Sequence, residues 1–334
     1  MAETILELRN VVVDLPVGKE VRRILHSISF TVQKGEILGL VGESGSGKSV
    51  TASAILQLLP GGSKAIQSGK IYFKGQDITQ NSPEAMRNLR GKEIAMIFQE
   101  PMTSLNPVFT IGRQFTDMLR THQPLSAAAA LKHAAFMLQS VQIPEPERIL
   151  KSYPYELSGG MRQRVMIAMA QACAPALLIA DEPTTALDVT IQAQILRLFR
   201  AAAAESGASA IFISHDLGVV SQLCQRVAVM YAGEIVEVGP VDAILKAPKH
   251  PYTQALLHSI PDFQTERGAL QAIPGSVPDL RSPLAGCPFT PRCEQAQPLC
   301  QTAKPDSCQV DASHQVSCWN YAKEAITYGS AAGA

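Results

Sequence analysis

The 334-residue chain has no excess charge of either sign and no long hydrophobic run. Lysine and arginine together number 29, and so do aspartate and glutamate. This balance argues against a general nucleic-acid-binding protein, because binding to a phosphate backbone needs a surplus of positive charge. A membrane-spanning helix needs roughly 18 consecutive apolar residues, and the sequence contains no such run. Because the N-terminus also lacks the features of a signal peptide, we expect a cytosolic protein that reaches a membrane only through partners.

The chain does contain ample apolar material, arranged in an alternating order. Hydrophobic residues make up 46% of the sequence, and strand-like runs alternate with helix-like segments up to about residue 255. We expect an antiparallel layer that includes Leu6–Val13 and Ile71–Phe73, and helices over Ala127–Val141 and Ile191–Glu205. Five short apolar runs are typical of a covered sheet: Ile37–Val41, Ile94–Phe98, Leu177–Asp181, Ala210–Ser214 and Val227–Tyr231. The pattern predicts an α/β fold that binds its ligand at the carboxyl ends of the strands.

A phosphate-binding loop follows the first of these apolar runs. Residues 42–49 read Gly-Glu-Ser-Gly-Ser-Gly-Lys-Ser, and a helix-like segment comes next. In such a loop the glycines let backbone N–H groups turn toward phosphate oxygens, and the helix start adds partial positive charge. Lys48 is expected to reach the β- and γ-phosphates, and the Ser49 hydroxyl to hold Mg²⁺. The predicted ATP contacts are Gly42, Glu43, Ser44, Gly45, Ser46, Gly47, Lys48, Ser49 and Val50.

Four polar residues that follow other predicted strands have the chemistry to complete this site. Asp181 is placed to hold Mg²⁺, and Glu182 to polarise a water for attack on the γ-phosphate. Two acids here also suit a plain helix cap, but the phosphate loop upstream favours the catalytic interpretation. Gln99 is expected to reach both Mg²⁺ and the attacking water, and His215 to donate a hydrogen bond to the γ-phosphate.

A second glycine motif points to the family. The run from Leu157 to Gly160 reads Leu-Ser-Gly-Gly and enters a helix-like segment, which is another anion-binding arrangement. A single bound nucleotide needs only one phosphate-binding motif on a domain, and this domain has two. The sequence resembles the ATP-binding cassette (ABC) family over about residues 5–255. The matching motifs, in the family's order, are the phosphate loop, Gln99, the Leu-Ser-Gly-Gly signature, Asp181-Glu182, Ala186-Leu187-Asp188 and His215.

The resemblance implies a P-loop NTPase core with an antiparallel β subdomain and an α-helical subdomain. Residues 1–265 would form the ATP-binding domain, with the helical subdomain at about 101–165, and residues 266–334 a small Cys- and Pro-rich appendage. It also implies that two cassettes pack head to tail, with each ATP between the phosphate loop of one and the signature of the other. Signature residues Ser158, Gly159, Gly160 and Gln163 would then contact the partner's ATP, and Asp188 would belong to the D-loop.

Other segments resemble the ATPase subunits of bacterial dipeptide, oligopeptide and nickel importers, most closely the D-type subunit of the dipeptide group. They are Gln99–Pro107, Asp181–Thr190, His250–Leu256 and the cysteine-rich tail. The resemblance implies a heterodimer of cassettes, two membrane permeases and an external solute-binding protein, with this chain at the cytoplasmic face of the bacterial inner membrane. The solute stays open among dipeptides, oligopeptides, nickel chelates and glutathione. Leu15 departs from the family, which often stacks an aromatic residue on adenine there.

Five of the 7 cysteines lie in the tail, which also repeats proline. Cytosolic proteins seldom keep structural disulfides, so the grouping suggests a metal. The closely paired spacing typical of zinc is absent, and the wider spacing suits an iron–sulfur cluster, with zinc and metal-free thiols left open. The family resemblance assigns a [4Fe–4S] cluster to Cys287, Cys293, Cys300 and Cys318, and leaves Cys308 without a counterpart. Cys173 and Cys224 are expected to be small buried hydrophobes.

Two other classes of function compete with ATP-driven import. A soluble ABC protein that acts on DNA or ribosomes would carry a long coiled coil or a second cassette, and the sequence shows neither. A redox sensor built on the cysteine tail would make the ATPase secondary. The motifs favour an importer ATPase that uses ATP and Mg²⁺ and has no nucleic-acid partner.

Overall fold

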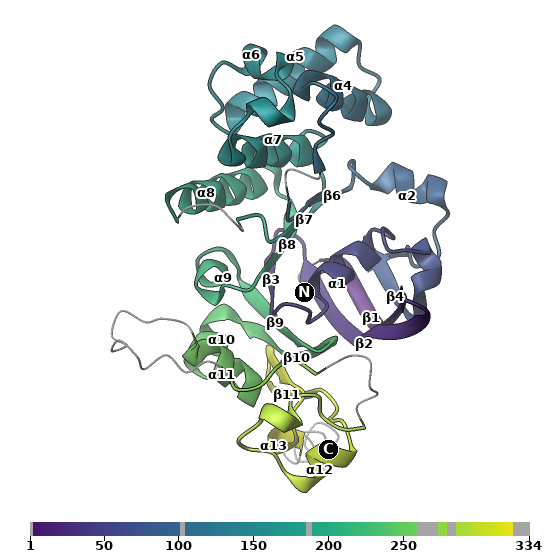
Figure 1. Ribbon diagram of the computed structural model, residues 1–334, viewed down its shortest axis with the longest axis vertical. Helices are drawn as coiled ribbons and strands as arrows, with labels where there is room; N and C mark the ends of the chain where they lie inside the picture. Colours follow the sequence, from purple (N-terminus) through teal and green to yellow (C-terminus); the bar gives the residue numbers. More distant parts are fainter. Residues whose placement is uncertain (1–2, 101–103, 185–188, 260–272, 279–284, 323–334) are drawn as a thin grey trace. The chain divides into compact units, whose positions relative to one another are not determined.

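The computed structural model describes residues 3–100, 104–184, 189–259, 273–278 and 285–322 (Figure 1). The chain divides into two compact units. Unit 1 comprises Met1–Ile5, Val32–Ile37 and Gln80–Ile213, and unit 2 comprises Leu6–Thr31, Leu38–Thr79 and Ser214–Ala334. The boundary predicted at residue 265 lies outside the described residues, so the division into 1–265 and 266–334 stays a prediction. In the described ranges, no helix is long and apolar enough to cross a bilayer.

Unit 1 is built on three parallel strands. β7 (Leu177–Asp181) lies between β6 (Ile94–Ile97) and β8 (Ser209–Ser214) and pairs with both. Every residue of β7 and β8 is buried, as parallel strands covered on both faces require. These strands confirm three of the predicted apolar runs. Because parallel strands end at the same edge, the residues that follow β6 and β7 are brought close together.

The helices of unit 1 lie mostly between β6 and β7 in the sequence. Four of them pack against one another (Figure 1): α4 (Ile111–His122), α5 (Ala127–Ser140), α6 (Pro146–Lys151) and α7 (Gly159–Gln171). Phe115, Leu119 and Leu138 are fully buried in this group. Two further helices are α2 (Pro83–Leu89) and α8 (Val189–Ser206), and a short 3-10 helix spans Pro154–Glu156. The predicted helices at 127–141 and 191–205 are therefore confirmed as α5 and α8.

Unit 2 contains a four-stranded antiparallel sheet, as predicted. Its strand order is β2-β1-β4-β5, and its strands are β1 (Thr4–Val17), β2 (Glu20–Gln33), β4 (Ile66–Phe73) and β5 (Gln76–Asp77). β1 pairs with β4 from Leu6 opposite Phe73 to Val13 opposite Ile66. Both strands extend beyond the predicted segments, because their outer halves alternate or are polar and carry a weaker apolar signal.

A second group of strands in unit 2 carries the phosphate loop. β3 (Ile37–Val41) pairs in parallel with β9 (Arg226–Tyr231), and β9 turns tightly into antiparallel β10 (Glu234–Pro240). The turn residues Ala232 and Gly233 both have positive φ, which matches the right-handed twist of a two-residue hairpin. The helices of this part are α1 (Lys48–Ile55), α9 (Leu217–Leu223), α10 (Val241–Lys246) and α11 (Pro251–His258), with a 3-10 turn at Gly62–Ala65.

The C-terminal appendage contains more regular structure than its composition predicts. β12 (His314–Val316) pairs with β10, and β11 (Cys308–Asp311) pairs with β12. Strands of three or four residues are too short to show a period in the sequence, and these form because β10 offers them an edge. The remaining elements are the 3-10 helix η3 (Thr290–Arg292), α12 (Pro298–Thr302) and α13 (Trp319–Ala322).

A buried polar contact joins β12 to β10. His314 donates from Nε2 to Glu237 Oε1 at 2.7 Å, and the backbone N–H groups of Lys249 and His250 donate to the same carboxylate at 2.7 and 2.9 Å. Burial raises the pKa of Glu237, but these hydrogen bonds outweigh it and leave the pKa below its ordinary value. The appendage is therefore attached to β10 through an ionised carboxylate as well as through strand pairing.

Candidate functional site

The phosphate loop joins β3 to α1 in unit 2, where the sequence predicts it. Gly42 and Gly47 have φ angles of +152° and +106°, in the region that favours glycine. A Cβ atom at Gly42 would lie 2.1 Å from the Met230 carbonyl oxygen, so a larger residue does not fit there. Gly47 begins α1 without a side-chain cap. A helix start of this kind directs backbone N–H groups toward an anionic ligand.

Two side chains place polar atoms inside this loop. The Lys48 ammonium donates to the carbonyl oxygens of Gly42 and Glu43 at 2.8 and 3.0 Å, and the residue is only 5% exposed. The Ser46 hydroxyl is buried and has no hydrogen-bond partner among the residues that the structure describes. Buried polar groups normally find partners, so a buried ammonium and an unpartnered hydroxyl in one loop fit a cradle for an anionic ligand.

Two residues that sequence reasoning missed hold Glu43, the second residue of the loop. The Tyr252 hydroxyl accepts a hydrogen bond from the Glu43 N–H at 2.8 Å. Arg292 donates to both carboxylate oxygens of Glu43, at 2.7 and 3.0 Å. Neither residue belongs to a nucleotide-binding motif, and each lies more than 200 positions from the loop. The sequence carries no local signal for such contacts.

In unit 1 the structure brings Gln99 and Glu182 together. Gln99 follows β6, Glu182 follows β7, and the Gln99 amide donates to Glu182 Oε2 at 3.0 Å. Asp181 is the last residue of β7 and is 5% exposed. Glu182 has a φ of +45°, a conformation that costs energy for a non-glycine residue and often marks a functional position. Carboxylate and amide oxygen atoms are also the metal ligands that Mg²⁺ prefers.

The signature residues form the start of α7. Ser158 is exposed and its hydroxyl accepts the Met161 N–H at 3.3 Å, which caps the helix. Gly159 and Gly160 are the first two residues of the helix. Gln163, one turn on, is buried, and within the described ranges its Nε2 atom has no hydrogen-bond partner. The motif thus combines an exposed helix start with a buried polar side chain one turn on.

Three predicted positions have simpler outcomes. His215 is exposed and directly follows β8, and Asp216 beside it caps α9 by accepting the N–H of Gly218 at 2.8 Å. Asp188 of the expected D-loop lies outside the described residues. Leu15 is half-buried near the end of β1.

The four cysteines assigned to a cluster line one small cavity of about 20 Å³ in the appendage, together with residues such as His250, Phe289 and Trp319. They are Cys287, Cys293, Cys300 and Cys318. Burial raises the pKa of three of these thiols, and that of Cys318 reaches about 11. In the described part of the chain, no three His, Cys, Asp or Glu residues are close enough to hold a single metal ion.

The other cysteines lie apart from this group. Cys308 is buried on β11 and its thiol donates to the Val316 carbonyl at 3.2 Å. Cys224 is buried, as predicted, whereas Cys173 is only half-buried.

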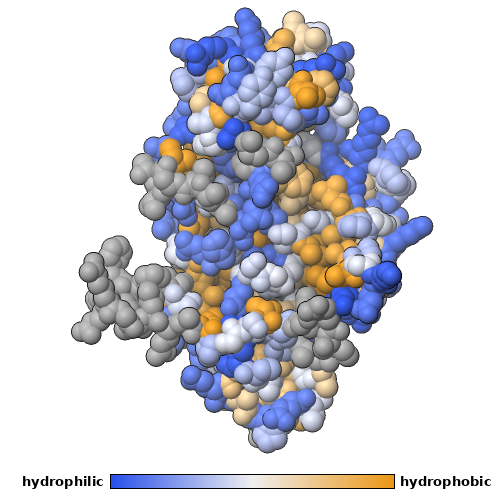
Figure 2. All heavy atoms as spheres, in the orientation of Figure 1, coloured by the Kyte–Doolittle hydropathy of each residue, from blue (hydrophilic) through white to orange (hydrophobic). Residues whose placement is uncertain are grey.

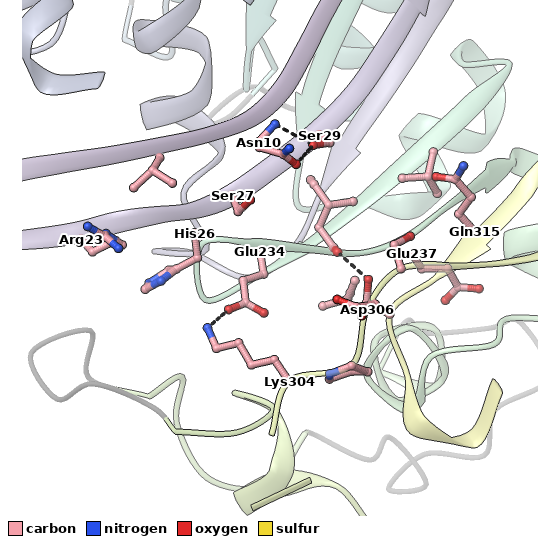
Figure 3. Close-up of a pocket in the computed structure, with 17 residues that line it drawn as sticks. Asn10, Arg23, His26, Ser27, Ser29, Glu234, Glu237, Lys304, Asp306 and Gln315 are labelled. Atoms are coloured by element: carbon pink, nitrogen blue, oxygen red, sulfur yellow. Dashed lines mark hydrogen bonds and ion pairs between the residues drawn. The ribbon is translucent and has the colours of Figure 1, made fainter. Parts of the chain in front are cut away.

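A larger cavity of about 450 Å³ lies elsewhere in unit 2, beside β1, β2, β10 and residues 304–307 (Figure 3). Lys304 reaches across it to Glu234, and Asn10 pairs with Ser29. His26 lines the same cavity, and burial, with the nearby charges of Lys304 and Arg23, lowers its pKa to about 4. Lys304 and Glu234 neutralise each other, and the lining includes none of residues 42–49, so the cavity is a polar crevice beside the appendage rather than the nucleotide site.

Two family descriptions match the chain. "ABC transporter" matches residues 25–185, and "Oligopeptide/dipeptide transporter, C-terminal region" matches residues 236–300. Among solved structures, the ATP-binding cassette MJ0796 in a dimeric post-hydrolysis state bound to ADP and Pi is similar, with a TM-score of 0.64 and 26% identity. That match covers 71% of this chain and 99% of the cassette.

Similar full-length proteins come from several bacteria. A probable peptide ABC transporter ATP-binding protein of Sinorhizobium fredii is 51% identical over 319 residues, which is 95% of both chains. The probable D,D-dipeptide transport ATP-binding protein of Escherichia coli is 46% identical and covers 98% of this chain and 100% of its own. The dipeptide transport ATP-binding protein of Bacillus subtilis is also 46% identical, covering 98% and 99%. With its phosphate loop, strand-end acids and both matched regions, this chain belongs to the ATP-binding ATPase subunits of ABC transporters, in the oligopeptide/dipeptide group.

Proposed function

We propose that this ATPase powers the uptake of short peptides, with dipeptides as the leading substrate class. The proposal rests on two features that occur together in this chain. A complete phosphate loop is built from Gly42 to Ser49, and the C-terminal region matches that of oligopeptide and dipeptide transporters over residues 236–300. Relatives named as peptide, D,D-dipeptide and dipeptide transport proteins match along nearly the whole length. Nickel chelates and glutathione are the competing solutes.

The residues of the site divide the work of hydrolysis. Lys48 and the loop N–H groups bind the phosphates, and Ser49, Gln99 and Asp181 would hold Mg²⁺, which would neutralise phosphate charge. Glu182 orients and polarises the attacking water, with Gln99 beside it, and His215 donates to the γ-phosphate. The 3.0 Å hydrogen bond between Gln99 and Glu182 supports a shared task for these two side chains.

The signature serves a second cassette, which is a different chain in a heterodimer. Ser158 caps α7 at an exposed position, where it is accessible to a nucleotide that another subunit holds. ATP then lies between the two subunits, so binding favours the closed dimer and hydrolysis releases it. Asp188 belongs to the same interface.

The helical group of unit 1 is the proposed contact with the permeases. Several large hydrophobic side chains are exposed on it, among them Val108 at 69%, Phe136 at 64% and Tyr155 at 64%. Figure 2 shows such apolar spots among hydrophilic residues over these helices. They lie on the loop before α4, on α5 and on the 3-10 helix Pro154–Glu156, and exposed apolar surface is one mark of protein contacts. Docking there would place the chain at the cytoplasmic face of the inner membrane, with two permeases and an external solute-binding protein completing the importer.

Glu182→Gln tests the catalytic assignment. The amide keeps the shape of the side chain but cannot polarise water, so hydrolysis should fall by about 100-fold or more while ATP still binds. Phosphate release and ATP affinity are measured in the assembled transporter. Near-normal turnover would remove Glu182 from its role, and peptide-stimulated turnover in the parent complex tests the substrate class.

We also propose that Cys287, Cys293, Cys300 and Cys318 hold a [4Fe–4S] cluster. Support comes from the single cavity that these four side chains share, which excludes Cys308. Four cysteine side chains around one cavity match the number of thiolate ligands that a four-iron cluster uses. Bound there, the cluster would crosslink an appendage that is too small to build a large core of its own.

Iron and acid-labile sulfide, measured after anaerobic purification, test this assignment. About four irons and four sulfides per chain are expected from the family's cluster type, and Cys287→Ser should abolish them. Cys308→Ser is the matched control, because it also removes a tail thiol and should leave the iron content unchanged. Zinc or no metal in the parent chain would refute the cluster and leave the ATPase proposal intact.

A further inference from the structure

The Arg292 side chain of the appendage is completely occupied by hydrogen bonds. A guanidinium has five N–H donors. Here Nε donates to the Pro274 carbonyl at 2.9 Å, and Nη1 donates to Glu43 Oε2 at 2.7 Å and to the Tyr231 hydroxyl at 3.3 Å. Nη2 donates to Glu43 Oε1 at 3.0 Å and to the Ile273 carbonyl at 3.3 Å. The side chain is 4% exposed, so this is a built site rather than a surface ion pair.

Glu43 is held at every polar group. Its carboxylate accepts the two-pronged contact from Arg292, and its N–H donates to the Tyr252 hydroxyl at 2.8 Å. Its carbonyl accepts the Ser46 N–H at 3.2 Å and the Lys48 ammonium at 3.0 Å. The path of the loop at Glu43 therefore determines where the Lys48 ammonium lies.

Packed rings set the spacing between the appendage and the loop. Phe289 lies just before η3, and its ring centroid is 5.2 Å from that of Tyr231 and 5.4 Å from that of Tyr252. Tyr231 and Tyr252 contact each other at 4.5 Å, and both are fully buried. Such a close-packed group has little freedom to shift, so Arg292 at the end of η3 is presented to Glu43 in one position.

The contact between Arg292 and Glu43 affects ATP binding because Glu43 carries a negative charge. A carboxylate on the phosphate loop would repel the negatively charged phosphates, and the fork of Arg292 neutralises it. The contact with Glu43 also raises the pKa of Arg292 above its ordinary value, so the guanidinium stays charged. Removal of Arg292 would leave an uncompensated, partly buried negative charge beside the nucleotide and free the loop to move.

Two other charged contacts of the appendage reach β10 instead of the loop. Lys304 pairs with Glu234, as Figure 3 shows, and His314 pairs with Glu237. Both acids belong to β10. These contacts attach the appendage but touch none of residues 42–49. Lys304 therefore provides a matched comparison for Arg292.

We propose that Arg292 is a positioning residue for the phosphate loop, through which the C-terminal appendage sets the affinity for ATP. It touches no nucleotide and acts through Glu43. The proposal needs only that the loop binds ATP, and it holds whichever solute is transported and whether or not the cysteines carry a cluster.

ATP affinity of the purified full-length chain tests the proposal, measured by displacement of a fluorescent ATP analogue. Arg292→Met should weaken ATP binding about tenfold or more, because it leaves the Glu43 carboxylate without its charged partner beside the phosphates. Arg292→Lys restores the positive charge without the two-pronged contact, so it should recover part of the lost ATP affinity. In the assembled transporter the change should appear mainly in KM for ATP, with kcat less affected.

Lys304→Gln is the control for appendage docking. It removes a cation of the appendage that pairs with a glutamate, and it should leave ATP affinity within about twofold of the parent. Hydrogen exchange of residues 42–49 should increase in Arg292→Met and stay unchanged in Lys304→Gln.

A folded Arg292→Met chain with parental ATP affinity would overturn the proposal, as would an equal loss in Lys304→Gln. Should Arg292→Met fail to fold, Glu43→Gln provides the second variant. It keeps the size of the side chain, weakens the two-pronged contact and is expected to increase hydrogen exchange of the loop. An unchanged exchange rate in Glu43→Gln would contradict a positioning role.

Discussion

Two glycine-containing loops lead into helices of this protein, and they are built in opposite ways. The phosphate loop before α1 is largely buried around Gly42, Ser46 and Lys48, and its glycines have positive φ. The signature before α7 is exposed at Ser158 and begins its helix with an ordinary serine cap. The first loop is closed by its own chain, whereas the second presents its helix start outward. This difference is what the proposed head-to-tail dimer requires.

The physical causes of the difference lie in what surrounds each loop. β9 runs behind the phosphate loop so closely that the Met230 carbonyl leaves no room for a Cβ at Gly42. At the signature, a Cβ on Gly160 would meet only the Ile191 methyl at 3.1 Å. Glycine is therefore required by backbone crowding in one loop and by much milder contact in the other.

The largest effect is expected from Gly42→Ala. The added methyl overlaps the Met230 carbonyl, so the loop must move and ATP affinity should fall by about 100-fold or more. Gly45→Ala is the control, because no atom lies within 4 Å of the Cβ it would add, although its φ of +79° adds some strain. ATP binding by the purified chain measures both. Equal losses would show that strain, and not crowding against β9, determines the loop.

Ser158→Arg should have the next largest effect, and it should act on the other subunit. A long cationic side chain at the exposed start of α7 would displace the signature from the partner's ATP and slow hydrolysis there by about 100-fold. Nucleotide trapping at each site of the assembled dimer separates the two. Ser126→Arg, which alters the equally exposed cap of α5, should leave both sites active. A greater loss at the chain's own site would contradict the head-to-tail arrangement.

The smallest effect is expected from Ser158→Ala, which separates capping from catalysis. Loss of the cap should lower the free energy of unfolding by about 1 kcal/mol. Ser126→Ala removes a comparable cap, with a 3.2 Å bond to Ala129 N–H, and should cost a similar amount. Chemical denaturation measures both. If Ser158→Ala costs no stability, the hydroxyl does not cap α7 in solution, and the signature differs from the phosphate loop less than the structure indicates.

Local patterns carry much of this architecture. The strands β3, β6, β7, β8 and β9 appear as short apolar runs because both of their faces are buried, and α5 and α8 show helical periodicity. The loop from Gly42 to Ser49 is recognisable because its chemistry needs fixed residue types at fixed spacing. The same applies to Asp181, which ends a buried strand, and to Glu182, which follows it directly.

Strands of only three or four residues cannot be predicted from such patterns. β11 and β12 contain four and three residues, and they form because β10 offers an unpaired edge. Their residues carry no period that distinguishes them from a loop, so the appendage is more ordered than its proline-rich composition predicts.

By itself the sequence determined the order of the five buried apolar strands and of two long helices, the position of the phosphate loop and the family to which the chain belongs. Each of these depends on residues that are neighbours in the chain. The tertiary structure alone decided that Gln99 donates a hydrogen bond to Glu182, that four cysteines line one cavity and that Arg292 binds the Glu43 carboxylate. The last contact joins residues separated by 249 positions. No local pattern encodes it, because it exists only once β9, α11 and η3 have packed their aromatic side chains together.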